Sequence, residues 1–250
     1  MAENASVADP FPKMARAYAI EINGTPVWQR NIDQRLAPAS LTKLMTALLV
    51  IEQLEGTRPV TVSRAASRET GSRLGLKAGQ ILTVQDLLAA TLLASANDAC
   101  RALADHLGSD PAAFVHAMNT RAVQIGMHHT HFSNACGHDA PGHYTSVADL
   151  LLLARQAWAN PRIRNVAALQ ETRITSVDGS QEWLVRNTNA LIGRYAPAIG
   201  LKTGTTPQAG KCLIAVAKKG QTEVLLVMLH GADRWWDAVD VMELAFARAQ

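Results

Sequence analysis

The strongest constraint on the fold is that strand patterns lie at both ends of the chain, with helical patterns between them. Near the start, two short β-prone segments, residues 17–21 and 26–29, flank Asn23-Gly24, a dipeptide that favours a tight hairpin turn. Near the end, residues 211–218 and 222–229 flank a second tight turn. If the first and last segments pair, they form one antiparallel sheet whose faces the helices cover. The sequence therefore predicts a three-layer α+β fold.

Helical periodicity dominates the middle of the chain. Apolar residues recur near a 3.6-residue period after Ser40, and Thr83 and Ser146 begin capping-box-like patterns. The predicted helices cover residues 41–51, 84–93, 98–107, 111–125, 147–158 and 234–248. We expect one catalytic domain over residues 1–250, with a helical subdomain at roughly 57–160 and a cleft between that subdomain and the sheet.

The composition is that of an ordinary soluble globular protein. The 250 residues are 48% hydrophobic and 18% charged, with a formal net charge of +3. This small charge, without a block of Lys and Arg, argues against a nucleic-acid partner. No apolar run reaches the roughly 18 residues of a membrane span, and the first residues lack a signal-peptide pattern. We therefore expect either a cytosolic protein or a mature chain without its export signal.

The cysteines, the clustered histidines and the tryptophan pair are expected to have structural roles rather than catalytic or metal-binding ones. Three cysteines leave at least one thiol unpaired, so small buried side chains are expected rather than a disulfide scaffold. The histidines in the predicted loop lack the helical spacing of zinc ligands, so neither a metal nor another cofactor is expected. Trp235-Trp236 is assigned to a helix face packed on the sheet. The residues concerned are Cys100, Cys136, Cys212, His128, His129, His131, His138 and His143.

Three short motifs carry the chemistry: Ser40-Leu-Thr-Lys43, Ser95-Ala-Asn97 and Lys202-Thr-Gly204. Alone, the first also fits a capped helix with an exposed lysine, the second a polar turn between helices, and the third a simple turn. Together they stand at a helix start, an inter-helix loop and a strand. In that order they match the motif set of penicillin-binding proteins and class A β-lactamases.

Ser40 is the predicted nucleophile and Lys43 its base. A serine hydroxyl is a poor nucleophile at neutral pH and needs an adjacent base. Three residues apart on a helix, the two side chains share one face. Lys43 can act as a base only if burial or a nearby cation, here Lys202, lowers its pKa. A helix start at Ser40 would also place backbone N–H groups near the developing oxyanion.

The second motif is assigned to proton transfer and substrate contact. Ser95 can relay a proton between Lys43 and a leaving amine. Asn97 offers a donor and an acceptor to a substrate amide. Both roles depend on the other two motifs, because Ser and Asn are common between helices.

The third motif is assigned to substrate binding. A strand edge at residues 202–204 can pair with an extended peptide, and Lys202 and Thr203 can hold a carboxylate. Gly204 lets the substrate backbone approach closely. The N–H of Thr205, together with that of Ser40, would form the oxyanion hole.

With these motifs the chain resembles the penicillin-recognising serine DD-peptidases, and among them the low-molecular-mass D-alanyl-D-alanine carboxypeptidase family. The resemblance runs from about residue 17 to 247 and includes stretches at 95–100, 126–134, 139–150, 187–189 and 200–210. It implies the DD-peptidase/β-lactamase-like fold and an acyl-enzyme on Ser40, formed from peptidoglycan stem peptides ending in D-Ala-D-Ala. It also implies that β-lactams acylate the same serine.

The resemblance carries two further expectations. Arg234, predicted to open the last helix, resembles an arginine that helps to bind the terminal carboxylate. Members of the family act in the periplasm or elsewhere outside the cytoplasm. The family resemblance therefore favours an exported protein whose signal peptide is missing from this sequence.

Two departures from the family pattern bear on function. His138 follows Gly137 where the family usually has leucine. The chain also ends directly after the last predicted helix, so neither a C-terminal β domain nor an amphipathic membrane anchor is expected. Endopeptidase-like members are often short in this way. A DD-carboxypeptidase is therefore the leading prediction, with a DD-endopeptidase that cuts peptide crosslinks as the alternative.

Two other functions are disfavoured. A class A β-lactamase needs a glutamate in a Glu-x-x-Leu-Asn setting to activate water, and neither Glu171 nor Glu182 lies in one. A penicillin sensor without peptide turnover would share the fold. The intact Ser40, Lys43 and Ser95 argue against such a loss of catalysis.

Overall fold

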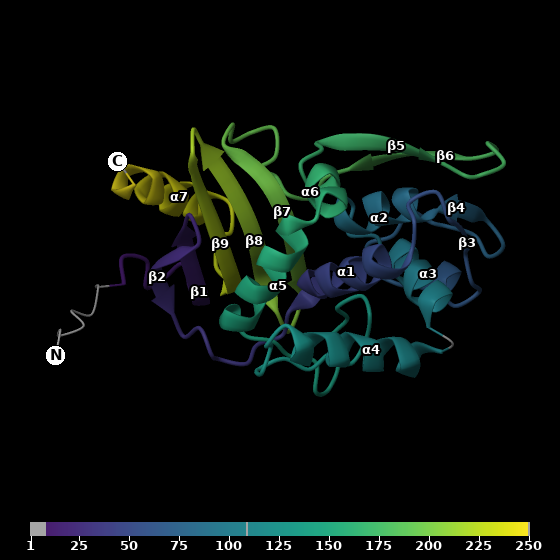
Figure 1. Ribbon diagram of the computed structural model, residues 1–250, viewed down its shortest axis with the longest axis horizontal. Helices are drawn as coiled ribbons and strands as arrows, with labels where there is room; N and C mark the ends of the chain where they lie inside the picture. The colour runs from purple at the N-terminus through teal and green to yellow at the C-terminus, as the bar shows by residue number, and fades with distance from the viewer. Residues whose placement is uncertain (1–8, 109, 250) are drawn as a thin grey trace.

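The computed structural model describes residues 9–108 and 110–249, and its central element is a five-stranded antiparallel sheet (Figure 1). The strand order is β2-β1-β9-β8-β7, so strands from the two ends of the chain lie side by side. The pairing of β1 with β9 confirms the predicted union of the first and last segments. The strands are β1 Ala15–Ile22, β2 Thr25–Arg30, β7 Ala198–Thr206, β8 Gly210–Lys219 and β9 Thr222–Gly231.

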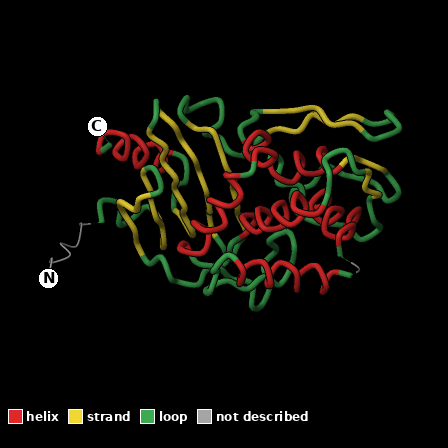
Figure 2. Tube along the Cα trace, in the orientation of Figure 1, coloured by secondary structure: helices red, strands yellow, loops and turns green. Residues whose placement is uncertain are grey.

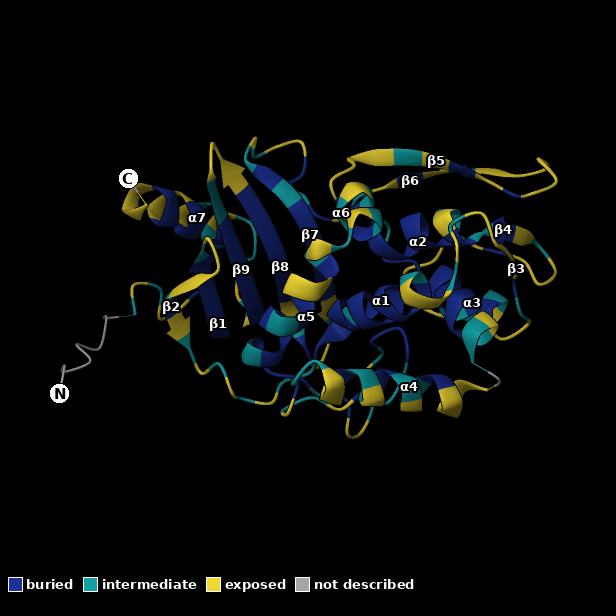
Figure 3. Cartoon of the chain, in the orientation of Figure 1, coloured by how far each residue is buried: buried dark blue, intermediate teal, exposed yellow. Residues whose placement is uncertain are grey.

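Alternating side chains give the sheet two buried faces, as the period of two along a strand requires. On β1, Ala17 and Ala19 join the core shared with the helical side, whereas Tyr18 and Ile20 join a second core. The last helix, α7 Trp236–Arg248, packs on this second core. Figure 1 shows α7 and the remaining helices on opposite sides of the sheet, and Figure 3 shows both interiors as buried. The predicted three-layer arrangement is confirmed.

The helical layer is built from six α-helices, which Figure 2 shows grouped beside the sheet. Two of the predicted start signals act as caps: Thr83 Oγ1 accepts the Asp86 N–H at 3.1 Å, and Ser146 Oγ accepts the Asp149 N–H at 3.2 Å. These helices are α1 Lys43–Gln53, α2 Val84–Leu92, α3 Asn97–Leu107, α4 Pro111–Gln124, α5 Val147–Ala159 and α6 Pro161–Ala167. No helix in the described part of the chain combines the length and apolar character needed to cross a membrane. The subdomain limits at 57 and 160 stay a prediction.

The sequence did not predict several short elements. These are the strand pairs β3 Pro59–Thr61 with β4 Ile81–Thr83 and β5 Glu171–Thr175 with β6 Glu182–Arg186, helix α6, and the 3-10 turn η2 Ala66–Arg68. In β5 and β6 only Ile174 and Val185 are buried, so the strands lack a continuous apolar face that would indicate them.

Two predictions are wrong. Cys100 and Cys136 form a disulfide 36 residues apart in sequence, whereas Cys212 is a buried free thiol, as expected. An odd cysteine count does not reveal which pair the fold brings together. Trp236, the first residue of α7, does not pack on the sheet. It is 74% exposed to solvent. Only Trp235, which is partly buried, packs against the second core.

A buried carboxylate joins the helical layer to the segment that precedes α2. Asp98, 1% exposed in the first turn of α3, accepts the backbone N–H groups of Leu74, Gly75 and Leu76 at 3.2, 2.9 and 3.0 Å. It also accepts the N–H of Ala99 at 2.9 Å, where the helix dipole favours an anion. Asp98 therefore satisfies several donors that would otherwise be buried without partners.

We predict that Asp98→Ala lowers the free energy of unfolding by about 2–4 kcal/mol, because buried N–H groups lose their acceptor. Urea unfolding followed by circular dichroism measures the change. Asp240→Ala, at an exposed position of α7, is the matched control and should change stability by less than about 0.5 kcal/mol. Equal losses in the two variants would contradict the role given to Asp98.

Candidate active site

The predicted nucleophile lies on a tight 3-10 turn rather than in the first turn of the α-helix. The turn η1 spans Ala39–Thr42, and α1 begins at Lys43. Ala39, directly before Ser40, has φ +48°, a region that costs a non-glycine residue about 1–2 kcal/mol. Neighbouring groups must therefore hold this turn in place.

A buried histidine supports the turn. The Ser133 N–H donates to His143 Nδ1 at 2.8 Å, so Nε2 carries the proton and donates to Thr42 Oγ1 at 2.9 Å. Thr42 Oγ1 donates in turn to the Ala39 carbonyl at 2.9 Å. Burial lowers the pKa of His143 to about 4, which keeps the ring neutral at physiological pH. This role was not predicted from the sequence, although His143 lies in one of the stretches that carry the family resemblance.

Two glycines contact the turn from either side. A Cβ on Gly137 would lie 2.0 Å from the Ala39 carbonyl oxygen, and a Cβ on Gly204 would lie 3.0 Å from the Ser40 nitrogen. Gly137 also has φ +87°, which favours glycine. The nucleophile turn is thus enclosed between the backbone of β7 and the backbone at Gly137.

Lys43 is fully buried beside Ser40. Its Nζ lies 2.9 Å from Ser40 Oγ, donates to Asn97 Oδ1 at 2.7 Å and donates to the Cys136 carbonyl. Burial lowers the pKa of Lys43 to about 7, while the negative charge of Glu69 acts in the opposite direction. A substantial fraction of Lys43 is therefore a neutral amine at neutral pH, the form that can accept a proton.

Lys202 is the second buried amine of the site. Its Nζ donates to Ser95 Oγ at 2.9 Å and to the Thr203 carbonyl at 3.0 Å. Burial, followed by the charges of Lys43 and Arg234, lowers the pKa of Lys202 well below its ordinary value. Desolvation is the first cause of the lowered pKa at both amines, and the repulsion expected between them adds to it at Lys202.

The second motif starts between α2 and α3, as predicted, but Asn97 is already the first residue of α3. Ser95 has φ +57° and is 8% exposed, and its hydroxyl accepts a hydrogen bond from Lys202 Nζ. The Asn97 amide is already engaged: its oxygen accepts from Lys43, and its nitrogen donates to the Thr70 carbonyl at 2.6 Å. Ser95 therefore contacts Lys202, and Asn97 contacts Lys43. The substrate contact predicted for Asn97 would use the second N–H of its side-chain amide.

The third motif lies on β7, the edge strand of the sheet. Thr203 is buried and its hydroxyl lies 2.8 Å from that of Thr188, a contact that the sequence did not predict. Arg234 precedes α7 instead of opening it, and its Nη1 donates to the Gly204 carbonyl at 2.8 Å and to Thr205 Oγ1 at 2.7 Å. All the predicted site residues therefore meet around Ser40 and the edge of β7, whereas the oxyanion hole stays a prediction.

The two glutamates weighed for a β-lactamase role lie on the β5–β6 hairpin. Glu171 is ion-paired with Arg186 and Glu182 with Arg173, and both carboxylates are about half exposed. Both of these ion-pair partners lie on the same hairpin rather than on the Ser40 turn.

Comparison with known proteins identifies the family. The family model described as D-alanyl-D-alanine carboxypeptidase (Peptidase_S11) matches residues 12–233. The chain belongs to this family. A D-alanyl-D-alanine carboxypeptidase of Streptomyces sp. strain K15 is 34% identical over 245 residues, which covers 90% of this chain and 84% of the relative. DacF of Bacillus subtilis, another D-alanyl-D-alanine carboxypeptidase, is 33% identical and is covered over 60% of its length, against 90% of this chain.

Solved structures of the family show the same fold. The crystal structure of the Streptomyces K15 DD-transpeptidase superposes with a TM-score of 0.88 at 32% identity, covering 96% of this chain and 100% of that one. The predicted family and the DD-peptidase-like fold are confirmed. The chain spans 60% of the Bacillus relative and 54% of the Escherichia coli relatives DacC and DacA, which are longer proteins.

We predict that Gly137→Ala lowers the free energy of unfolding by about 3 kcal/mol or more, because the added methyl group meets backbone atoms that cannot move aside. Denaturant unfolding measures the loss. Gly179→Ala is the matched control, since Gly179 also has positive φ but has open space around its Cβ position. It should cost only about 1–2 kcal/mol. Similar losses at both positions would contradict the close approach at Gly137.

Proposed function

We propose that this chain is a serine-type D-alanyl-D-alanine carboxypeptidase that removes the terminal D-alanine of peptidoglycan stem peptides. The observation that carries the proposal is the Ser40–Lys43 pair: Nζ lies 2.9 Å from Oγ, and burial lowers the pKa of Lys43 to about 7. A buried amine with this pKa can act as a general base at neutral pH. Membership of the carboxypeptidase family supports the same reaction.

In the acylation step, neutral Lys43 takes the proton of Ser40 while Oγ bonds to the carbonyl carbon of the penultimate D-alanine. The N–H groups of Ser40 and Thr205 are assigned to the oxyanion that forms. When the peptide bond breaks, the leaving nitrogen receives a proton through Ser95, whose hydroxyl is bonded to Lys202. Water then attacks the acyl-enzyme and releases the shortened peptide.

Two basic side chains beside the edge of β7, Lys202 and Arg234, support recognition of a free carboxylate. Lys202 and Arg234 lie close enough for the charge of Arg234 to lower the pKa of Lys202. Arg234 also donates hydrogen bonds to the Gly204 carbonyl and to Thr205 Oγ1. These bonds keep its positive charge next to the edge strand β7. We assign Lys202, Thr203 and Arg234 to the terminal carboxylate of the substrate, and Asn97 and the edge at Gly204 to its peptide groups.

Two related reactions share the acyl-enzyme and are kept as alternatives. Cleavage of a peptide crosslink would make the protein a DD-endopeptidase. Transfer of the acyl group to an amine, instead of water, would make it a transpeptidase, and a solved relative carries the name DD-transpeptidase. β-Lactams, which mimic the acylating peptide, are expected to acylate Ser40 under all of these alternatives.

An extracytoplasmic location is proposed for the chain. The Cys100–Cys136 disulfide supports it, because disulfides persist mainly in oxidising compartments. Peptidoglycan stem peptides lie outside the cytoplasmic membrane as well. The proposed partners are these peptides and β-lactams, with no nucleic-acid partner.

We predict that acylation by a fluorescent penicillin accelerates as pH rises through about 7. The pKa of Lys43 is lowered to about 7, so the proton-accepting amine is the minor form below this pH and the major form above it. Stopped-flow rates between pH 5 and 9 test this. A pH-independent rate, or a rate that falls as pH rises through 7, would contradict the assignment of Lys43 as the base.

The function itself is tested by mass spectrometry of products from a pentapeptide ending in D-Ala-D-Ala and from a crosslinked muropeptide dimer. Loss of one D-alanine from the pentapeptide is expected, and Ser40→Ala should abolish it. Conversion of the dimer alone would establish the endopeptidase. A product joined to an added amine acceptor would reveal transfer. Turnover of neither substrate, with Ser40 still acylated by penicillin, would overturn the proposal in favour of a penicillin sensor.

A further inference from the structure

The segment 134–138 packs against the helix that carries the base. The Ala135 carbonyl accepts the hydroxyl of Thr46 at 2.6 Å, and the next carbonyl, that of Cys136, accepts from Lys43 Nζ. Thr46 and Lys43 are one turn apart on α1, so two successive carbonyls follow one face of this helix. We call residues 134–138 the clamp loop.

The Cys136 carbonyl determines which way the amine of Lys43 points. A neutral amine has two N–H donors and one lone pair, and Nζ has three oxygen neighbours, on Asn97, Cys136 and Ser40. The amide oxygen of Asn97 and the carbonyl oxygen of Cys136 can only accept, so they take the two N–H groups. The lone pair is then directed to the Ser40 hydroxyl, which can donate to it. Without the Cys136 carbonyl, the amine could rotate and direct an N–H to Ser40 instead.

Internal hydrogen bonds give the clamp loop its shape. Asn134 Oδ1 accepts the N–H groups of Cys136, Gly137 and His138 at 3.2, 2.7 and 3.0 Å, and Asn134 Nδ2 donates to the His138 carbonyl at 2.9 Å. His138 Nε2 also lies 2.8 Å from a carboxylate oxygen of Glu69. These bonds shape the loop but do not by themselves fix it against the helix that carries Asn97.

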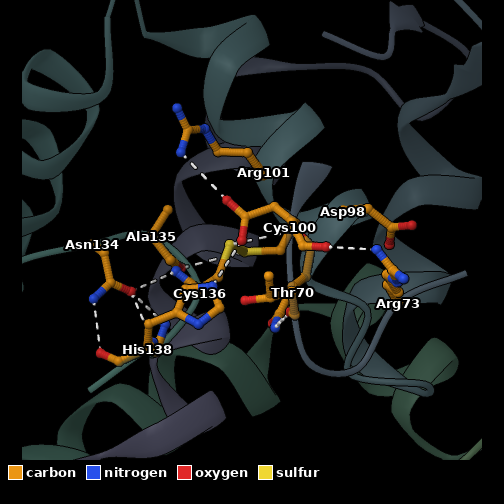
Figure 4. A network of polar contacts seen from close by, with 12 residues as sticks. Thr70, Arg73, Asp98, Cys100, Arg101, Asn134, Ala135, Cys136 and His138 are labelled. Carbon is orange, nitrogen blue, oxygen red and sulfur yellow. Dashed lines mark hydrogen bonds and ion pairs between the residues drawn. A yellow bond between two sulfur atoms is a disulfide. The ribbon is translucent and has the colours of Figure 1, made fainter. Parts of the chain in front are cut away.

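The disulfide provides that link. Figure 4 shows the Cys100–Cys136 bridge between the clamp loop, with Asn134 and His138, and the helix that carries Cys100. Cys100 is three residues after Asn97 on α3, so the bridge covalently joins the two elements that supply the acceptors of Lys43. The Cys136 sulfur also lies 3.8 Å from the Asn97 carbonyl oxygen.

We propose that the Cys100–Cys136 disulfide is a positioning element for acylation, which holds the Cys136 carbonyl and Asn97 around Lys43 so that the amine faces Ser40. This inference rests on the proposed function. Breaking the bridge would leave both thiols in the protein and release the clamp loop from α3. The acylation rate of the reduced protein would then fall, although Ser40, Lys43 and Asn97 are unchanged.

Both cysteines of the bridge are buried, and the cavity that Cys136 lines is the route by which a reductant would reach it. This cavity of about 490 Å³ borders the clamp loop and is lined by Glu69, Arg101, Asn134, Cys136 and His138, among others. A dithiol such as dithiothreitol would transfer two electrons and two protons to the bridge. Its own two thiols would close to a disulfide, and Cys100 and Cys136 would become free thiols.

The experiment measures acylation by a fluorescent penicillin in stopped flow, in a Cys212→Ala background so that thiols arise only from the bridge. The oxidised chain, the dithiothreitol-reduced chain and the Cys100→Ala/Cys136→Ala variant are compared. The limiting acylation rate constant should fall by about 10-fold or more in the last two, with the non-covalent dissociation constant unchanged. Reoxidation of the reduced chain should restore the rate.

Leu103→Ala is the matched control for lost stability. Leu103 is buried on α3 but belongs to neither the clamp loop nor the site, so its truncation should lower the melting temperature and leave the acylation rate of the folded protein unchanged. An equal fall in this control, or unchanged rates after reduction and in the double variant, would overturn the proposal. If neither the reduced chain nor the double variant folds, the bridge is needed for stability rather than for positioning. That result would also overturn the proposal. No acylation by the oxidised chain would instead contradict the proposed function.

Discussion

The complete burial of Lys43 among neutral oxygen atoms is the constraint on which the rest of the site depends. Its contacts are a hydroxyl, an amide oxygen and a backbone carbonyl, from Ser40, Asn97 and Cys136, and none carries a full negative charge. Loss of water therefore disfavours the ammonium form, and the pKa falls to about 7. A carboxylate in contact would reverse this effect. The Ser40 turn, α3 and the clamp loop, which supply these contacts, must all close around Lys43 to keep water out.

The two buried amines have different environments, which suit different tasks in the proposed mechanism. Lys43 is close to the nucleophile, and its pKa near 7 suits a base. Lys202 is buried as well, and the charges of Lys43 and Arg234 add to burial in lowering its pKa below the ordinary value. Protonating Lys43 during acylation raises the positive potential at Lys202, because interacting sites titrate together. A protonated Lys202 is then a better proton donor, through Ser95, at the moment when the leaving nitrogen needs a proton.

Local patterns in the sequence predicted the sheet, most helices and all three motifs, because hairpin turns, helix caps and motif residues act over a few positions. Contacts between distant segments could not be found in this way. The disulfide between Cys100 and Cys136, the hydroxyl pair of Thr188 and Thr203, and the orientation of Trp236 depend on how elements meet in space. The hairpin of β5 and β6 was missed for a different reason, since most of its side chains are exposed.

Strained backbone lies beside both reactive hydroxyls. Ala39 and Ser95 have φ of +48° and +57°, although neither is glycine, and such positions persist only where surrounding contacts enforce them. At Ala39, the hydrogen bond from Thr42, itself supported by His143, and the close approach of Gly137 provide this enforcement. The loop around Gly137 has none of the motif residues, yet a larger residue there would displace the turn that holds Ser40. The geometry of the nucleophile is therefore constrained by backbone contacts from this distant loop as well as by the motif in which it lies.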